Sequence, residues 1–89
     1  MTTLGPYPEY DRYLRLLTDA MRYKLRINAH KGDIGRVPTD ILRKYLLTEL
    51  TELDDAVERK SEIEIILETA DACNFLLGFL ISAVRTMGD

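Results

Sequence analysis

The chain is poor in the residues that mark several common protein classes. It contains no tryptophan, one cysteine and one histidine in 89 residues. One cysteine excludes an internal disulfide, and we expect a cytoplasmic protein because no secretory leader pattern is present either. An excess of basic residues is also missing, since 12 Lys and Arg stand against 15 Asp and Glu. The net charge of −3 excludes a general nucleic-acid binder.

Long uncharged runs are missing as well. The longest stretch without a charged residue runs only from Ala72 to Val84, whereas a membrane-spanning helix needs about 20 residues. We therefore expect no membrane span and interpret this stretch as a buried helix. Apolar residues nevertheless make up 46% of the chain, more than the single core of a small domain can hide. This surplus predicts self-association.

Apolar residues recur at helical spacing in three segments, and no strand pattern is present. After an irregular arm over residues 1–8, we predict three helices, over Pro8–Asn28, Thr39–Lys60 and Ser61–Met87. Thr39 or Asp40 is expected to cap the second helix, and a loop over residues 29–38 precedes it. The short joint after Lys60 makes the last two helices antiparallel neighbours. The predicted fold is one all-α domain over residues 1–89, an antiparallel bundle of about three long helices completed by oligomerisation.

The last predicted helix is apolar on more than one face. Leu77 and Ile81 belong to the stripe expected to face the other helices, whereas Ala72, Leu76 and Phe79 lie on another face. A helix that is apolar all round must be buried on all sides, which three helices of one chain cannot achieve. We therefore predict a homo-oligomer, a dimer or a dimer of dimers, with this helix at the interface.

Four acidic residues lie on or beside the apolar stripes of the last two helices: Glu49, Glu52, Glu68 and Asp71. The i, i+3 spacing within each pair puts its two carboxylates on neighbouring positions. Antiparallel packing brings both pairs to a similar distance from the joint, where they would repel one another unless a cation joins them. Such oxygen ligands suit Mg²⁺ or Mn²⁺. Because ExxE pairs are also common on solvated helix faces, a metal site and a solvated face both stay open.

Three short blocks resemble one known family. Residues 48–52 (TELTE) followed by 68–71 (ETAD) resemble the ExxE…ExxD signature of the MazG-like all-α nucleoside triphosphate pyrophosphohydrolases. Residues 24–32 (KLRINAHKG) are similar to the KLxxNxHKG segment of one branch, and residues 71–75 (DACNF) to its continuation. The resemblance covers about two-thirds of the chain. Relatives often carry an aromatic residue soon after the KG, where this chain has Asp33.

The resemblance implies hydrolysis of a nucleoside triphosphate between the α- and β-phosphates, with Mg²⁺ as cofactor and Mn²⁺ as a substitute. The products are a nucleoside monophosphate and pyrophosphate, which suits housekeeping of the nucleotide pool. The metal ligands carried over are Glu49, Glu52, Glu68 and Asp71. Glu49 is also the candidate catalytic residue that orients or deprotonates the attacking water, because its apolar flanks should raise its pKa.

The resemblance and the chemistry of the side chains also suggest which residues bind substrate. Lys24 and Lys31 would meet phosphate oxygens as point charges. Asn28 and Asn74 would contact the sugar or the base, since an amide offers both a donor and an acceptor. For Asn74, a hydrogen bond between helices inside a dimer is the competing interpretation.

Two other functions remain as alternatives. A phosphoribosyl-ATP pyrophosphohydrolase of histidine synthesis shares the short helical body and the acidic motifs, although the KLxxNxHKG block belongs to the other branch. A non-catalytic helical dimerisation or adaptor module would explain the apolar surplus without any chemistry. Such a module has no reason to bind Mg²⁺ or Mn²⁺ through its helix faces, so metal binding separates it from the two enzymes.

Overall fold

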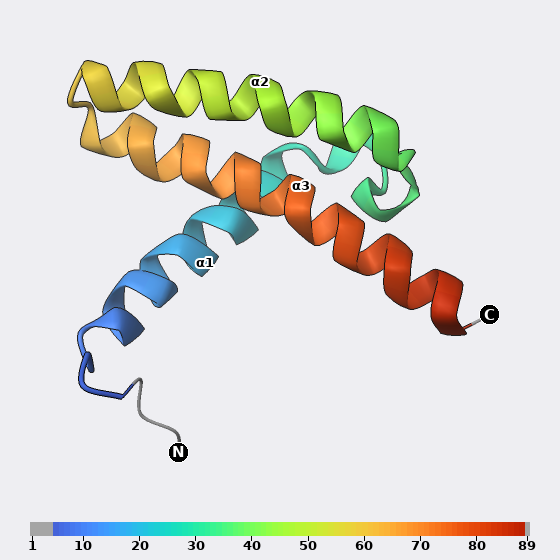
Figure 1. Cartoon of the computed structure of the whole chain (residues 1–89), viewed down its shortest axis with the longest axis horizontal. Coiled ribbons are helices and arrows are strands. Elements are labelled where there is room, and N and C mark those ends of the chain that lie inside the picture. Colours follow the sequence, from blue (N-terminus) through green and yellow to red (C-terminus); the bar gives the residue numbers. More distant parts are fainter. Residues whose placement is uncertain (1–4, 89) are drawn as a thin grey trace.

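The computed structural model describes residues 5–88, and within this range it contains helices and no strand (Figure 1). The three α-helices are α1 (Tyr10–Ile27), α2 (Thr39–Glu58) and α3 (Glu62–Gly88). Two short 3₁₀ turns, η1 (Ala29–Lys31) and η2 (Ile34–Arg36), lie between α1 and α2. The prediction of an all-α chain is confirmed. Residues 1–4 of the expected irregular arm lie outside the described part of the chain.

The start of α2 differs from the prediction. Thr39 is already the first helical residue, and Pro38 stands in the capping position without any side-chain cap. The carbonyl of Pro38 accepts hydrogen bonds from the backbone N–H groups of Ile41 and Leu42, at 3.0 and 2.9 Å. The predicted cap at Thr39 or Asp40 is therefore wrong. The extended backbone of Pro38, with ψ 142°, lets the helix begin directly behind the proline.

A tight reversal joins α2 to α3. Lys60 takes the left-handed backbone conformation, with φ 55°, directly after α2 ends. The N–H of Ser61 then reaches back to the carbonyl of Ala56 at 3.2 Å, which closes the last turn of α2. The chain leaves this turn into α3, so α2 and α3 run antiparallel, side by side, as the sequence predicted (Figure 1).

α1 crosses α3 and does not complete a closed bundle. It packs against α3, whereas no Cα atom of α1 within the described residues comes within 8 Å of α2. Figure 1 shows α1 leaving the α2–α3 hairpin at a wide angle from the middle of α3. The structure is thus an open set of three helices in which α3 contacts both of the others.

The loop between α1 and α2 packs closely on α3 through two glycines. A Cβ atom on Gly78 would lie 3.1 Å from the backbone oxygen of Ile34 and 3.2 Å from Leu42 Cδ1. A Cβ atom on Gly35 would collide with the side chain of Ile81. The missing side chains therefore allow η2 to rest directly on α3. This contact fixes the loop beside the middle of α3.

The fully buried apolar core of the described chain is small. It is formed by Leu42, Ala56 and Ala70 together with the nearly buried Ala72. Ala72, which the sequence placed on the second apolar face of this helix, is already buried within one chain. Leu76, Leu80 and Val84 are exposed on α3, with 59% of Leu80 accessible. One chain therefore leaves a large apolar surface uncovered.

α3 is long and apolar enough, by length and composition, to cross a membrane, with a mean hydropathy of 1.6 in its best window. Core helices of soluble proteins meet the same criterion. Here the first half of α3 carries Glu62, Glu64, Glu68 and Asp71, and both other helices pack against it.

Candidate functional site

Three carboxylates from α2 and α3 converge. One oxygen each of Glu49, Glu68 and Asp71 lies within 4.8 Å of the other two. All three side chains are half-buried between the helices. The antiparallel hairpin thus brings together three of the four acidic residues that the sequence singled out. Glu52 is exposed and does not belong to this acidic cluster of Glu49, Glu68 and Asp71.

The surroundings of Glu49 favour its protonated form. Burial raises its pKa to about 8, and a hydrogen bond with Glu68 and the negative charges of Asp71, Glu52 and Glu68 act in the same direction. The pKa of Glu68 is also raised, first by its burial. The apolar flanks predicted this direction for Glu49.

The acidic cluster offers what a hard divalent cation requires. The Oε2 atoms of Glu49 and Glu68 are buried and have no hydrogen-bond partner within the described residues. Buried oxygens without a partner are costly, and a cation held between them would satisfy both. All the candidate metal ligands are carboxylate oxygens, which suit Mg²⁺ or Mn²⁺. These residues fit the metal that the resemblance implies.

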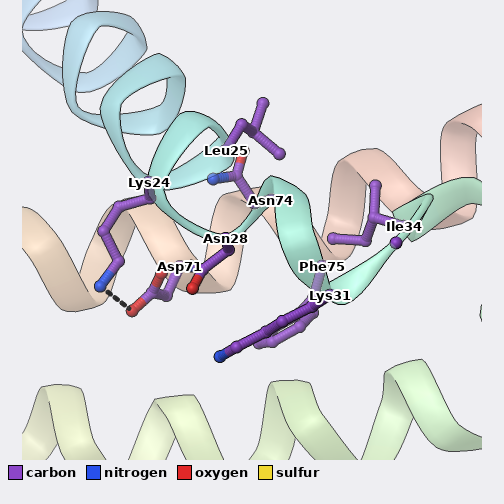
Figure 2. Close-up of a pocket in the computed structure, with 9 residues that line it drawn as sticks. Lys24, Leu25, Asn28, Lys31, Ile34, Asp71, Asn74 and Phe75 are labelled. Atoms are coloured by element: carbon purple, nitrogen blue, oxygen red, sulfur yellow. Dashed lines mark ion pairs between the residues drawn. The ribbon is translucent and has the colours of Figure 1, made fainter.

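A lysine from α1 reaches the acidic cluster. Lys24 Nζ lies 3.1 Å from Asp71 Oδ2, and both side chains are mostly buried, with 19% and 16% exposed. Figure 2 shows this ion pair beside the end of α1. The sequence placed Lys24 at the phosphates of a substrate and did not predict its contact with Asp71.

A cavity of about 150 Å³ adjoins the acidic cluster (Figure 2). Its polar lining includes all four residues predicted to bind substrate together with Asp71: Lys24, Asn28, Lys31, Asp71 and Asn74. In Figure 2, Lys24, Asn28 and Lys31 extend to the same side of α3 as Asp71. The four predicted residues come from the last turn of α1, the turn after it and α3. The fold brings them together at one cavity.

In the side-chain amide of Asn74 the nitrogen forms a hydrogen bond and the oxygen has no partner among the described residues. Only 5% of it is exposed, and its Nδ2 donates a hydrogen bond to the backbone oxygen of Met21 at 3.1 Å. Its Oδ1 is buried without a partner in the described part of the chain. The competing interpretation of a bond between helices is thus realised within one chain. Asn74 Oδ1 is thus an acceptor that no group of the described residues satisfies.

The turn that carries Lys31 is anchored to the far end of α3. Asp33 Oδ1 accepts a hydrogen bond from the N–H of Gly35 at 2.9 Å, and Asp33 Oδ2 pairs with Arg85 at 2.8 Å. Arg85 and the Gly35 N–H hold the pKa of Asp33 below its usual value. Asp33 therefore anchors this loop to α3.

Sequence reasoning missed the apolar wall of the cavity, which Leu25, Ile34 and Phe75 form. The sequence position of Phe75 did indicate its place in the cavity, since Phe75 lies one helical turn after Asp71 and directly follows Asn74. Tyr45 of α2 supports it, with ring centroids 5.5 Å apart. No sequence pattern indicated Ile34, because its position depends on the approach of η2 to Gly78.

No known protein family matches the chain, and no curated protein or solved structure does so either. The acidic cluster and the cavity are therefore the features of the described chain that bear on its function.

Proposed function

We propose that this protein is a metal-dependent nucleoside triphosphate pyrophosphohydrolase, which cleaves a ribo- or deoxyribonucleoside triphosphate to the monophosphate and pyrophosphate. The observation that carries the proposal is the position of the acidic cluster at the edge of a cavity that also holds two lysines and two asparagines. Carboxylates suit a metal, lysines suit phosphates, and amides with an apolar wall suit a nucleoside. One site thereby offers the chemistry for each part of the substrate.

In this proposal Glu49, Glu68 and Asp71 hold Mg²⁺, or Mn²⁺ in its place, and the exposed Glu52 joins them from the edge of the cluster. The bound metal would polarise the phosphorus and lower the pKa of a water molecule. Glu49 also orients that water or takes its proton, because it lies among the carboxylates that would hold the metal.

The cavity residues divide the rest of the substrate among them. Lys24 and Lys31 meet phosphate oxygens, while Asn28 and Asn74 meet the sugar or base. One N–H of the Asn74 amide already bonds to Met21, which leaves its second N–H and its unpartnered Oδ1 for the substrate. The ring of Phe75 supplies an apolar surface for the nucleoside.

The proposal extends to the oligomeric state and the cellular location of the enzyme. A homo-oligomer, a dimer or a dimer of dimers, would cover the apolar side chains that one chain leaves exposed on α3. We place the protein in the cytoplasm, in housekeeping of the nucleotide pool, with no nucleic acid and no membrane as partner.

A non-catalytic dimerisation or adaptor module is the second candidate. It is favoured by an apolar groove between α1 and α3, lined by Tyr13, Leu16, Leu17, Ile65, Ile66 and Thr69. A partner helix would fit this apolar groove, and such binding requires no catalytic residues. The module does not explain why buried carboxylate oxygens converge beside Lys24.

A screen for pyrophosphate release tests the proposal. The common NTPs and dNTPs, and phosphoribosyl-ATP for the histidine-synthesis alternative, are each incubated with Mg²⁺ and with Mn²⁺. We expect release from at least one nucleotide, and its loss in Asp71→Asn, which keeps the size of the side chain and removes its charge. The matched control is Asp54→Asn, an exposed change on α2 outside the acidic cluster. No release from any substrate would reject the hydrolase, and equal release from Asp71→Asn would reject the assignment of the metal site to the acidic cluster.

A further inference from the structure

Lys24 and a metal ion would compete for the same carboxylate. Lys24 Nζ lies 3.1 Å from Asp71 Oδ2, and Asp71 belongs to the acidic cluster with Glu49 and Glu68. Among the described residues, no other Lys, Arg or His comes within 4.0 Å of a carboxylate oxygen of this cluster. Lys24 is therefore the counter-ion that the fold supplies to a strongly negative site.

The pair is unlike an ordinary surface ion pair. Each side chain is less than one-fifth exposed, so water screens the attraction only weakly. Surface pairs on the same chain, such as Arg22 with Asp19, are mostly exposed and contribute little. The ammonium next to Asp71 consequently opposes the approach of a second cation. Binding of a divalent cation to Asp71 favours release of Lys24.

The released ammonium would stay inside the cavity. Lys24 and Asp71 both line it, together with Lys31 and Asn28. A phosphate chain that enters this cavity offers negative charge to Lys24 at the moment when the metal takes its place at Asp71. Metal and phosphate would therefore each make the binding of the other more favourable.

We propose that Lys24 is a resident counter-ion of Asp71, that a divalent cation displaces it, and that the displaced ammonium then binds the phosphates of the substrate. This proposal rests on the proposed function and adds a regulatory step to it. Free metal binds the empty site weakly, and the site fills when metal and nucleotide arrive together. Lys24 thus competes with the metal for Asp71 before it contacts the substrate.

The test measures the affinity of the whole chain for Mn²⁺ alone, from the electron paramagnetic resonance signal of the unbound ion. We compare the wild type with Lys24→Met, which keeps a long side chain and removes the charge. An opposite charge nearby changes the proton affinity of a carboxylate by about tenfold or more, and a similar effect on a metal is expected. Lys24→Met should therefore bind Mn²⁺ about tenfold more tightly than the wild type.

A second titration adds a nucleoside triphosphate analogue with a methylene bridge between the α- and β-phosphates. In the presence of Mn²⁺, Lys24→Met should bind this analogue more weakly than the wild type, because a phosphate contact is missing. The two affinities thus move in opposite directions. A residue that only maintained the packing of α1 on α3 would weaken both.

Two further variants separate charge from packing. Lys24→Arg keeps the positive charge and should bind Mn²⁺ as the wild type does. Lys31→Met removes a charge from the same cavity without touching the acidic cluster, and its affinity for Mn²⁺ alone should change less than about threefold, because a distant exposed charge is screened. Circular dichroism of all four proteins shows whether each is folded.

The failures of this proposal and of the proposed function look different. If the wild type binds Mn²⁺ and Lys24→Met does not bind it more tightly, the counter-ion role is overturned and the metal centre stands. If Lys24→Arg binds Mn²⁺ as tightly as Lys24→Met, the charge is not the cause and the role is again overturned. If the wild type and Lys24→Met both bind no Mn²⁺, the metal centre and the counter-ion role fall together.

Discussion

Asn74 of α3 donates a hydrogen bond from its side-chain amide to the backbone oxygen of Met21 in α1, over 3.1 Å. This bond lies one turn of α3 from Asp71 and one turn of α1 from Lys24. It therefore fixes where α1 crosses α3, and with it the place where Lys24 meets the acidic cluster. A single buried amide connects the packing of the fold to the geometry of the site.

Removal of this amide should destabilise the protein. In Asn74→Ala the hydrogen bond between α3 and the backbone oxygen of Met21 is lost and the buried amide leaves a cavity, so we expect the free energy of unfolding to fall by about 1–3 kcal/mol. Urea unfolding monitored by circular dichroism measures the change. The control is Thr48→Ala on α2, whose exposed hydroxyl bonds only to the backbone of its own helix. Its effect should stay within about 0.5 kcal/mol, and an equal loss in both variants would contradict the role of Asn74.

Glu49 should make the metal-free protein less stable at higher pH. Its pKa is about 8 in the folded chain against an ordinary value of 4.5, so the folded state holds a proton that the unfolded state has lost between these values. Unfolding releases this proton, and the free energy of unfolding falls as the pH rises through that window. Glu49→Gln removes the titrating group. It should match the wild type near pH 5 and exceed its stability near pH 9 by about 1–3 kcal/mol, allowing for partial screening of a half-buried group.

Thermal unfolding of the two proteins across this pH range, with a chelator present, measures the difference. The control is Glu58→Gln, an exposed glutamate at the end of α2 that takes no part in the acidic cluster. Its difference from the wild type should stay constant with pH. A constant difference for Glu49→Gln as well would show that Glu49 does not hold a proton in the folded state.

The helices and the convergence of the carboxylates could be predicted because they depend on local periodicity. A rise of about 1.5 Å per residue and a short joint at Lys60 suffice to bring the pair Glu49 and Glu52 to a similar height as the pair Glu68 and Asp71. The ion pair of Lys24 with Asp71 could not be predicted in this way, because it depends on where α1 crosses α3. That crossing is set by the Asn74 amide and by the glycine contacts of η2, which leave no periodic signal. The start of α2 was predicted wrongly because Thr39 and Asp40, the two candidate capping residues, directly follow Pro38, which is the actual cap.

The absence of a side chain at Gly78 should matter for the site as well as for packing. In Gly78→Ala the new Cβ atom would press on the backbone oxygen of Ile34, 3.1 Å away, and neither the helix nor the turn can move without cost. We expect a loss of about 1–3 kcal/mol in the free energy of unfolding. Gly88→Ala is the matched control, because nothing lies within 4 Å of its added Cβ atom. Denaturant unfolding of both variants checks the prediction, which fails if Gly78→Ala is as stable as the control.

The exposed apolar face of α3 should hold copies of the chain together. Leu80 is 59% exposed in one chain, and Leu76 and Val84 lie one turn before and after it. Leu80→Glu places a charge in this face, which a buried interface does not tolerate. Sedimentation should show an oligomer for the wild type and a smaller species for Leu80→Glu. Lys44→Glu, an exposed charge change on α2, is the control and should keep the oligomer. A folded wild-type monomer at micromolar concentration would exclude the predicted association.

Metal and nucleotide should stabilise the protein together more than either does alone. A ligand that binds only the folded state adds about 2.7 kcal/mol at a hundredfold excess over its dissociation constant. Mg²⁺ is commonly held loosely until phosphates add further ligands, so Mg²⁺ alone should raise the melting temperature slightly. The methylene-bridged analogue alone should also act weakly, since the acidic cluster next to the cavity repels its phosphates. With both present, each removes the obstacle to the other, and the rise should exceed the sum of the separate rises.

Thermal scans with Mg²⁺, analogue, both and neither measure this synergy, and Asp71→Asn provides the control. In that variant the metal loses a charged ligand and Lys24 loses its ion-pair partner, so the analogue alone should bind at least as well as in the wild type. The additional rise with Mg²⁺ should disappear. A dimerisation module has no shared site for metal and phosphate, and it predicts rises that are absent or merely additive in both proteins. Equal synergy in the wild type and in Asp71→Asn would place the metal elsewhere on the chain, because Asp71 could then not be one of its ligands.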